Sequence, residues 1–212
     1  MSDHALNSSF PCREADLGHF PLVCVTNRHL VTGDFLTQLG NVMHLHPAAV
    51  ILREKDLDEA AYEKLAQDVL TLGRIHDVPV ILHTFTNVAV KLGARAIHLP
   101  LPLLRQLTPD EYDAFDVIGT SCHSLADAQE AVKLGADYIT AGHIFATKCK
   151  DGLPPRGLPF LREMTKNCPL PVYAIGGISA VNLPAVRRMG AAGACVMSGM
   201  MRKETYQEYF SK

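Results

Sequence analysis

The sequence predicts a single domain of the (β/α)8 barrel class, and three observations support this prediction. The chain has 212 residues, which is enough for one domain with a full hydrophobic core. Short apolar runs rich in β-branched residues recur along it, as expected for parallel strands buried on both faces. Helical patterns alternate with these runs, and closing so many strands into a barrel leaves no unpaired sheet edge. An open, doubly wound sheet is the structural alternative.

Eight strands are expected, and each is short, rich in β-branched residues and nearly all apolar. They span Leu22–Asn27, Ala48–Glu54, Val78–Thr84, Ala96–Leu99, Asp116–His123, Tyr138–Phe145, Pro171–Gly177 and Gly193–Gly199. In a barrel of this class the carboxyl ends of the strands together build the active site. The sequence therefore predicts a site assembled from residues that lie far apart in the chain.

The segments between the strands carry helical patterns with recognisable ends. The segment Leu57–His76 places apolar residues on one helix face, namely Ala61, Leu65, Val69 and Leu72. The segment Ser124–Gly135 starts with a serine suited to the N-cap and ends with a glycine suited to a left-handed stop. The segment Ser179–Gly190 repeats this scheme, so each helix would return the chain to the start of the next strand.

Composition and charge argue against several classes of protein. The net charge of −2 disfavours a dedicated nucleic-acid binder, and no apolar run approaches the roughly 20 residues that span a bilayer. The N-terminus lacks a basic segment followed by an apolar one, which predicts a cytoplasmic protein. The cysteines and histidines show no metal-binding spacing. We expect a barrel domain over residues 21–212, preceded by an arm or capping segment over residues 1–20, and a homo-oligomer is left open.

Two regions carry signals for binding anions. Small glycine-bearing turns close the last two strands, and backbone N–H groups in such turns can hold a phosphate. Their residues are Gly176, Gly177, Ser198 and Gly199. The alternative is that these glycines only permit tight turns. Arg53 and Lys55 bracket the end of the second strand, either as a second anion-binding pair or as an ordinary solvated strand end.

The segment after the sixth strand reads GHIFATKCKDGLPPRG and begins its polar part at His143. It contains Thr147, Lys148 and Lys150, followed by glycines and prolines. This composition suits a mobile lid that places cations over an anionic ligand, and a plain surface loop is the alternative.

Among the histidines, His123 is the expected general base. It follows Ser121 where the fifth strand opens into the site, and imidazole is the usual general base near neutral pH. His83 and His98 lie within apolar runs, and we expect both to be hydrogen-bonded core residues. Cys122 should point to the opposite face from its neighbours, which disfavours a Cys–His nucleophile pair.

Several segments of the chain together resemble the thiamine phosphate synthase/TenI superfamily. They read ILREKD, VPVIL, GARAIHL, GTSCHSLADAQEAVKLGADYITAGHIFATKCK, PVYAIGGI and GACVMSG, and the likeness runs from about Leu22 to Met201. The resemblance implies a (β/α)8 TIM barrel, a phosphate-bearing small-molecule substrate and a role in thiamine biosynthesis.

The superfamily has two branches that the sequence can separate. Synthases couple hydroxymethylpyrimidine diphosphate to thiazole phosphate, and they hold Mg2+ through one Asp after the third strand and another after the fourth. These positions are Thr84 and Leu103 here, so the resemblance implies neither a metal nor a cofactor unless the protein is a synthase. The segment GHIFATKCKDGLPPRG resembles the thiazole tautomerase branch, because synthases usually have Gly-Pro where this chain has Gly142–His143.

The resemblance therefore implies a thiazole tautomerase, an isomerase that makes the ring of a thiazole phosphate carboxylate aromatic by metal-independent proton transfer. It gives the catalytic role to His123 and phosphate binding to the turns of the last two strands. Further substrate-binding residues are expected to be Arg53, Lys55, Ser121, His143, Thr147 and Lys150. The alternatives are a thiamine phosphate synthase, which is a transferase, and a non-catalytic barrel that binds thiazole or thiamine phosphate and regulates.

Overall fold

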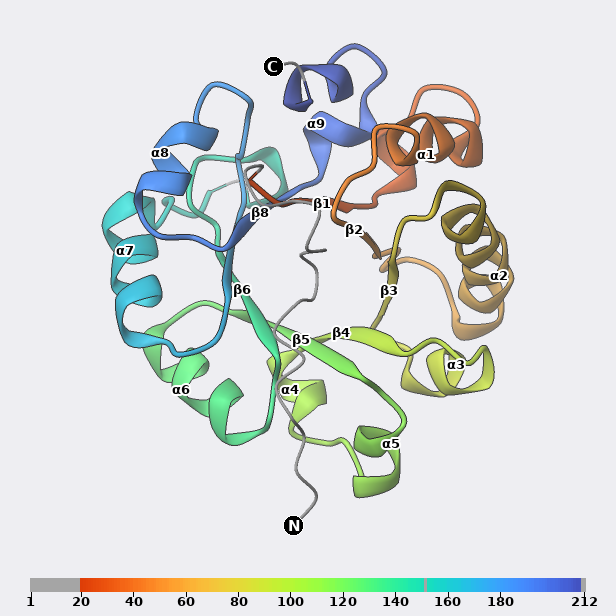
Figure 1. Ribbon diagram of the computed structural model, residues 1–212, viewed down its shortest axis with the longest axis horizontal. Coiled ribbons are helices and arrows are strands. Elements are labelled where there is room, and N and C mark those ends of the chain that lie inside the picture. Colours follow the sequence, from red (N-terminus) through yellow and green to blue (C-terminus); the bar gives the residue numbers. More distant parts are fainter. Residues whose placement is uncertain (1–19, 151, 211–212) are drawn as a thin grey trace.

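The computed structural model describes residues 20–150 and 152–210, which form a closed barrel of parallel strands ringed by helices (Figure 1). The strands pair in chain order, and β1 pairs with β8 to close the ring. They are β1 (Leu22–Val25), β2 (Ala49–Leu52), β3 (Val80–His83), β4 (Ala96–Pro100), β5 (Val117–Cys122), β6 (Tyr138–Gly142), β7 (Val172–Ile175) and β8 (Gly193–Val196). The predicted (β/α)8 TIM barrel is confirmed, and each strand lies within or beside its predicted range.

The helices lie outside the ring and follow the strands in turn (Figure 1). They are η2 (Arg28–Leu30), α1 (Phe35–Met43), α2 (Glu59–His76), α3 (Thr86–Lys91), α4 (Leu101–Leu104), α5 (Pro109–Asp113), α6 (Leu125–Lys133), η3 (Lys148–Lys150), α7 (Gly157–Asn167), α8 (Leu183–Arg188), α9 (Ser198–Met201) and η4 (Tyr206–Tyr209). The arm expected over residues 1–20 lies outside the described residues except for Phe20, so it and the domain boundary stay predictions.

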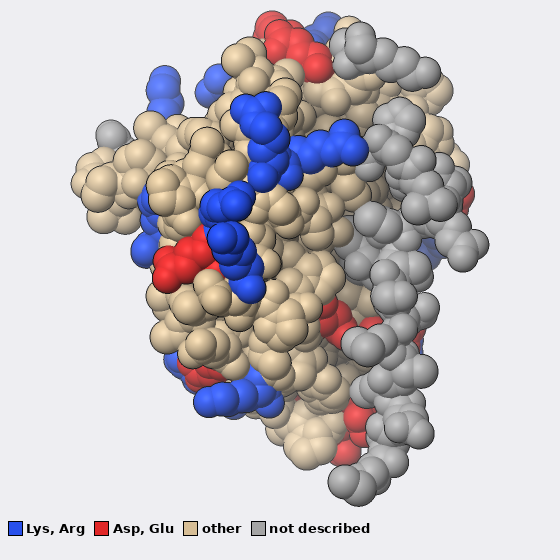
Figure 2. Space-filling view, turned by 60° about the vertical axis from the view of Figure 1, so that its left-hand side comes forward, with Lys and Arg blue, Asp and Glu red and all other residues tan. Residues whose placement is uncertain are grey.

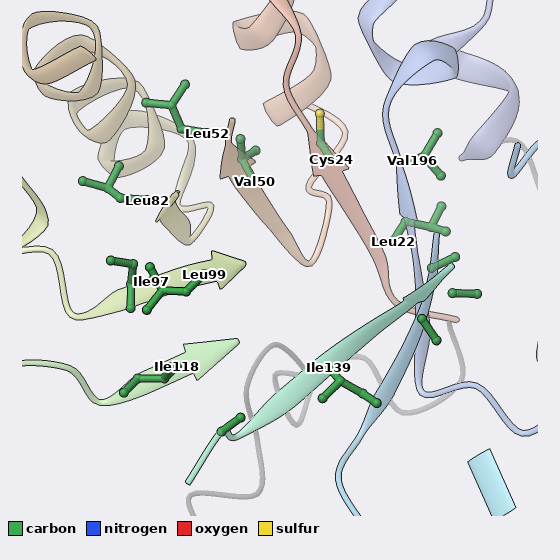
Figure 3. Packing of buried hydrophobic residues seen from close by; sticks show 14 of the residues in the cluster. Leu22, Cys24, Val50, Leu52, Leu82, Ile97, Leu99, Ile118, Ile139 and Val196 are labelled. Carbon is green, nitrogen blue, oxygen red and sulfur yellow. The ribbon is translucent and has the colours of Figure 1, made fainter. Parts of the chain in front are cut away.

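The hydrophobic core has two layers because alternate residues of each strand face opposite sides of the sheet. Figure 3 shows the outer layer, in which side chains such as Leu52, Leu82 and Val196 leave the strands on the side that faces the helices. A smaller inner cluster fills the barrel, and its members are Val23, Val25, Ala49, Ile51, Ile81, Ala96, Tyr138, Tyr173 and Cys195. The inner layer closes the bottom of the barrel and leaves the carboxyl ends of the strands for polar groups.

The ends of α2 and α6 follow from capping residues that the sequence displays. The Asp58 side chain accepts a hydrogen bond from the N–H of Ala61 and begins α2, two residues later than the predicted start. Ser124 accepts from the N–H of Asp127 and begins α6 as predicted, and Gly135 adopts the expected positive φ of 76° beyond its end.

The third predicted helix is shorter than its pattern, because α8 covers only Leu183–Arg188. The Asn182 side chain accepts a hydrogen bond from the N–H of Ser179 at 2.9 Å and donates one to the carbonyl of Gly177 at 2.9 Å. These bonds fold the first four predicted residues into a turn, and Pro184 then occupies the first turn of the helix, where its missing N–H costs nothing.

The outer faces of the helices are charged. Lys and Arg side chains gather on the side of the molecule formed by α7 and α8 (Figure 2), where α7 carries Arg162 and Lys166 and α8 carries Arg187 and Arg188, all exposed. Such faces are typical of helices whose other face packs on a sheet. Within the described part of the chain, no helix combines the length and the apolar character that crossing a membrane requires.

Tyr62 joins α2 to the barrel through its hydroxyl group. The side chain is fully buried, and its hydroxyl donates to the carbonyl of Leu52 at 2.7 Å and accepts from the N–H of His83 at 2.8 Å. One oxygen therefore satisfies backbone groups at the carboxyl ends of β2 and β3, directly below the polar residues that follow these strands.

We expect Tyr62→Phe to lower the free energy of unfolding by about 2 kcal/mol, because it leaves two buried backbone groups without a partner. Urea unfolding measures this loss. Tyr112→Phe is the matched control, since the Tyr112 hydroxyl is only partly buried and donates to the carbonyl of Gly135. An equal loss in both variants would contradict the bridging role of Tyr62.

Candidate active site

A cavity of about 230 Å³ opens at the carboxyl ends of the strands. Its lining contains almost every residue that the sequence singled out: Arg53, Lys55, Ser121, His123, His143, Thr147, Lys150, Gly176, Gly177 and Ser198. These side chains come from β2, β5, β6, β7 and β8 or from the loops that follow them. The barrel therefore brings the predicted residues together in one place, although their individual roles stay predictions.

Gly199, which is predicted to bind phosphate, lies outside the lining of this cavity, as does Lys148 of the predicted lid. Gly199 backs instead onto the C-terminal segment, where the Thr205 hydroxyl donates to its carbonyl at 2.6 Å. A β-carbon at Gly199 would collide with the Tyr209 hydroxyl. Close packing accounts for a glycine at this position without a ligand.

His123 stands at the rim of the cavity with its ring orientation set by the backbone. Its backbone N–H donates to the Asp127 carboxylate at 2.7 Å, which fixes the residue just before the start of α6. Its ring Nδ1 lies 2.8 Å from the carbonyl oxygen of Gly142. A carbonyl oxygen can only accept, so Nδ1 carries the proton and the neutral ring keeps its lone pair on Nε2. This is the tautomer that a general base needs.

Cys122 cannot act as a nucleophile beside this histidine. The residue is fully buried in the outer core layer, on the opposite face of β5 from the cavity. Burial raises the pKa of its thiol to about 12, so the reactive thiolate is not formed near neutral pH.

The turn after β7 brings the chain close to the end of β6. Gly176 and Gly177 have φ angles of 96° and 65°, in the left-handed region that favours glycine. A β-carbon at Gly176 would collide with the His143 side chain, and one at Gly177 would lie 2.5 Å from the carbonyl oxygen of Ala146. Both glycines are therefore required by backbone geometry, and their predicted phosphate contacts would use the same exposed backbone.

Arg53 and Lys55 reach the cavity from the loop after β2, while Glu54 between them is buried. The Glu54 carboxylate accepts from the Thr26 hydroxyl at 2.7 Å and from the N–H of Arg28 at 3.1 Å. The Thr26 hydroxyl in turn accepts from the N–H of Arg53 at 2.9 Å. Glu54 thus ties the loops after β1 and β2 together and holds the two cations toward the cavity.

The cations around this wall lie close enough to affect one another. The pKa of Lys55 is lowered mainly by the charge of the neighbouring Arg53, then by burial, and then by the charge of Lys150. Like charges that are held together favour an anionic ligand, because such a ligand relieves their repulsion.

Backbone hydrogen bonds join the two ends of the segment after β6 to each other. The N–H of Arg156 donates to the carbonyl of His143 at 3.0 Å, and the N–H of Gly157 donates to the carbonyl of Ile144 at 3.0 Å. His143 Nε2 also donates to the carbonyl of Leu153 at 3.3 Å. Lys150 lines the cavity from this segment, whereas the predicted lid movement stays a prediction.

The sequence missed His83 as a residue of the cavity wall. His98 is a hydrogen-bonded core residue as predicted, with Tyr138 Oη 3.0 Å from Nδ1 and Ser121 Oγ 2.9 Å from Nε2. His83 is also largely buried, but it lines the cavity beside Arg53 and Lys55. The available signal is its position as the last residue of β3, next to β2, which is followed by Arg53 and Lys55.

The described residues of the cavity do not fit a divalent metal ion. Mg2+ prefers carboxylate oxygens, and none of the described residues that line the cavity is an Asp or a Glu. Thr84 has its hydroxyl against the ring of His83, and Leu103 packs against the hydrophobic core. Over the described ranges, no group of three His, Cys, Asp or Glu side chains could hold a metal ion.

Comparisons with known proteins agree on one family. The profile described as thiamine monophosphate synthase matches residues 22–200. Thiamine-phosphate synthase from Syntrophomonas wolfei is 33% identical over 189 residues, which cover 86% of this chain and 88% of that protein. The putative thiamine-phosphate synthase 2 of Aquifex aeolicus is 31% identical over 177 residues, which cover 84% of this chain and 95% of that protein.

The fold agrees with the same family. The solved structure of a thiamine phosphate pyrophosphorylase from Pyrococcus furiosus superposes with a TM-score of 0.76 at 26% identity. The match covers 90% of this chain and 93% of that one. Because sequence and fold point to the same proteins, the chain belongs to the thiamine monophosphate synthase family.

Proposed function

We propose that this protein is a thiazole tautomerase of thiamine biosynthesis, an isomerase that acts on a thiazole phosphate carboxylate. One observation carries the proposal. The described cavity lining combines cations and glycine-bearing turns with a histidine base and contains no carboxylate. Binding an anionic ligand and moving its protons requires only these groups, whereas release of a diphosphate normally needs a metal ion to neutralise the developing charge.

The reaction follows from the position of the base. His123 Nε2 takes the proton from the ring carbon that bears the carboxylate, and the electron pair moves through the allylic system. A proton is then delivered to the exocyclic alkene carbon, so the ring becomes aromatic and no atom is gained or lost. General base catalysis of this kind contributes about 10²–10⁴-fold to a rate. Arg53 and Lys55 would stabilise the negative charge that develops beside the carboxylate.

The second candidate is a thiamine phosphate synthase, and the names of the relatives favour it. Those cited above are called thiamine-phosphate synthase or thiamine phosphate pyrophosphorylase, so they support the transferase better than the isomerase. Against this stands the cavity, whose described lining contains no carboxylate. By the resemblance, Thr84 and Leu103 occupy the positions of the metal-binding Asp residues of synthases. The family and a phosphate-bearing substrate are common to both candidates.

Two assays on the purified protein separate the candidates. In the first, the thiazole phosphate carboxylate tautomer is supplied and aromatisation is followed by ultraviolet absorbance, with and without EDTA. In the second, hydroxymethylpyrimidine diphosphate and thiazole phosphate are supplied with Mg2+ and released pyrophosphate is measured. Aromatisation that survives EDTA supports the tautomerase, and Mg2+-dependent pyrophosphate release without aromatisation contradicts it. Tight binding of thiazole phosphate with neither activity would indicate the non-catalytic binder.

A further inference from the structure

We propose that His83 determines substrate specificity by donating a hydrogen bond from Nε2 to the carboxylate of the ligand, beside Arg53 and Lys55. The identity of the ligand rests on the proposed function. The role of His83 rests on how its ring is held and on where β3 stands in the barrel.

Three contacts hold His83, one through its backbone and two through its ring. Its backbone N–H donates to the Tyr62 hydroxyl at 2.8 Å, and its ring stacks on that of His98 with centroids 5.7 Å apart and planes 19° apart. Its Nδ1 lies 2.6 Å from the Thr84 hydroxyl oxygen. These ring contacts orient the remaining nitrogen, and a specific contact requires such an oriented donor.

Thr84 adopts a backbone conformation that threonine rarely has. Its φ is 72°, in the left-handed region, where a β-branched residue is strained. Its N–H donates to the carbonyl of His98 at 3.2 Å, which ties the turn to the neighbouring strand. A strained residue whose hydroxyl meets the ring of a cavity histidine points to a role for that ring beyond packing.

The hydrogen bonds decide which ring nitrogen carries the proton. Among the described residues, the Thr84 hydroxyl has no partner other than His83 Nδ1. We therefore assign the hydroxyl as the donor, because no other described residue accepts its hydrogen. In the neutral ring the proton then lies on Nε2. The described residues contain no buried side-chain nitrogen or oxygen without a partner, so the unbonded Nε2 has some contact with solvent. His83 lines the cavity, which gives this nitrogen a route to a ligand.

The charge of the ring agrees with a donor role. Burial is the main cause that lowers the pKa of His83 well below its usual value, and His98, then Arg53 and then Lys55 lower this pKa further. The ring therefore stays neutral near pH 7 and offers one directed N–H beside two cations. A directed donor next to positive charge is complementary to an anionic oxygen, and it adds direction to the attraction that the cations supply.

The position of β3 in the barrel favours contact of His83 with the carboxylate of the ligand rather than with its phosphate. The predicted phosphate turns follow β7 and β8, and β3 stands four places from β7 in a ring of eight strands, which is directly opposite. The helices that follow these strands, α3 and α7, accordingly lie on opposite sides in Figure 1. His123 follows β5, midway between them. A ligand with two anionic groups would thus span the barrel and present its ring to the base.

A pair of substitutions tests this assignment. In His83→Gln the terminal amide reaches the position of Nε2, whereas in His83→Asn the amide reaches only that of Nδ1. Calorimetry measures binding of two ligands, the aromatic thiazole phosphate carboxylate and the same thiazole phosphate without the carboxylate. We expect His83→Asn to weaken binding of the first ligand about 10- to 100-fold, to leave the second unchanged, and His83→Gln to restore most of the loss.

The outcomes that overturn the assignment are distinct. Equal weakening of both ligands by His83→Asn, or no weakening of either, would show that His83 does not contact the carboxylate. If the wild-type protein binds neither ligand, the proposed function fails together with this assignment. Should His83→Asn not fold, Thr84→Ala and Thr84→Ser decide. The loss of the hydroxyl in Thr84→Ala must weaken only the carboxylated ligand, and Thr84→Ser must not.

Discussion

Replacing His123 with glutamine is expected to lower the turnover of the thiazole phosphate carboxylate tautomer at least about 100-fold. The glutamine amide can still donate to the carbonyl of Gly142, which lies 2.8 Å from Nδ1 in the native ring, so the loop after β5 keeps its conformation. The amide cannot accept the substrate proton at neutral pH. The loss should therefore appear in kcat, while KM changes little, because the binding groups on β2, β7 and β8 remain in place.

The neighbouring Cys122 provides the control for this experiment. Its thiol lies in the outer core layer, so Cys122→Ala should keep turnover close to the wild-type value. A loss in Cys122→Ala comparable to that in His123→Gln would indicate a Cys–His pair and contradict the assignment of His123 as a lone base. Turnover in His123→Gln near the wild-type value would remove His123 from the chemistry altogether.

Replacing Ser198 with aspartate is expected to weaken binding of thiazole phosphate about 100-fold or more. Ser198 begins α9 at the cavity, and the predicted phosphate would lie against this turn and that of Gly176 and Gly177. A carboxylate about 4 Å from a phosphate would cost about 4 kcal/mol at an effective dielectric constant of 20. Calorimetric titration with thiazole phosphate measures the effect.

Two comparisons make this result specific to the phosphate. Ser198→Ala removes at most one hydrogen bond, so its expected loss is only about 2- to 12-fold. The corresponding thiazole alcohol, which has no phosphate, should bind equally to wild type and Ser198→Asp. Unchanged affinity of Ser198→Asp for thiazole phosphate would refute the placement of the phosphate at these turns.

The fold could be predicted because every strand is a short, largely apolar run and helical patterns separate these runs. The predicted start of a helix is wrong where a local side-chain hydrogen bond competes with the helical pattern. Ser179 has an N–H that bonds to the Asn182 side chain, so the predicted helix begins only at Leu183. The sequence shows an asparagine at position 182, but not the hydrogen-bond partners of its side chain. These partners depend on the path of the turn, which tertiary contacts determine.

The sequence predicts which strand ends form the site, but not the role of each residue in it. Arg53, Lys55 and His123 line the cavity because the carboxyl ends of all the strands open on the same side of the barrel. His83 was assigned to the core because a histidine in an apolar run is usually a hydrogen-bonded core residue. Only the structure shows that its Nδ1 is occupied by Thr84, and a positive φ at a threonine cannot be read from the sequence.

The two hydrogen bonds that join His143 to Arg156 and Ile144 to Gly157 have a consequence for how this family can diversify. They bring the two ends of the segment between them together at one point on the barrel. Each doubling of the length of such a loop costs only about 0.6 kcal/mol in closure entropy, so insertions are tolerated. A segment grafted from a relative between these two bonds would bring its own ligand contacts while the register of the eight strands stayed unchanged.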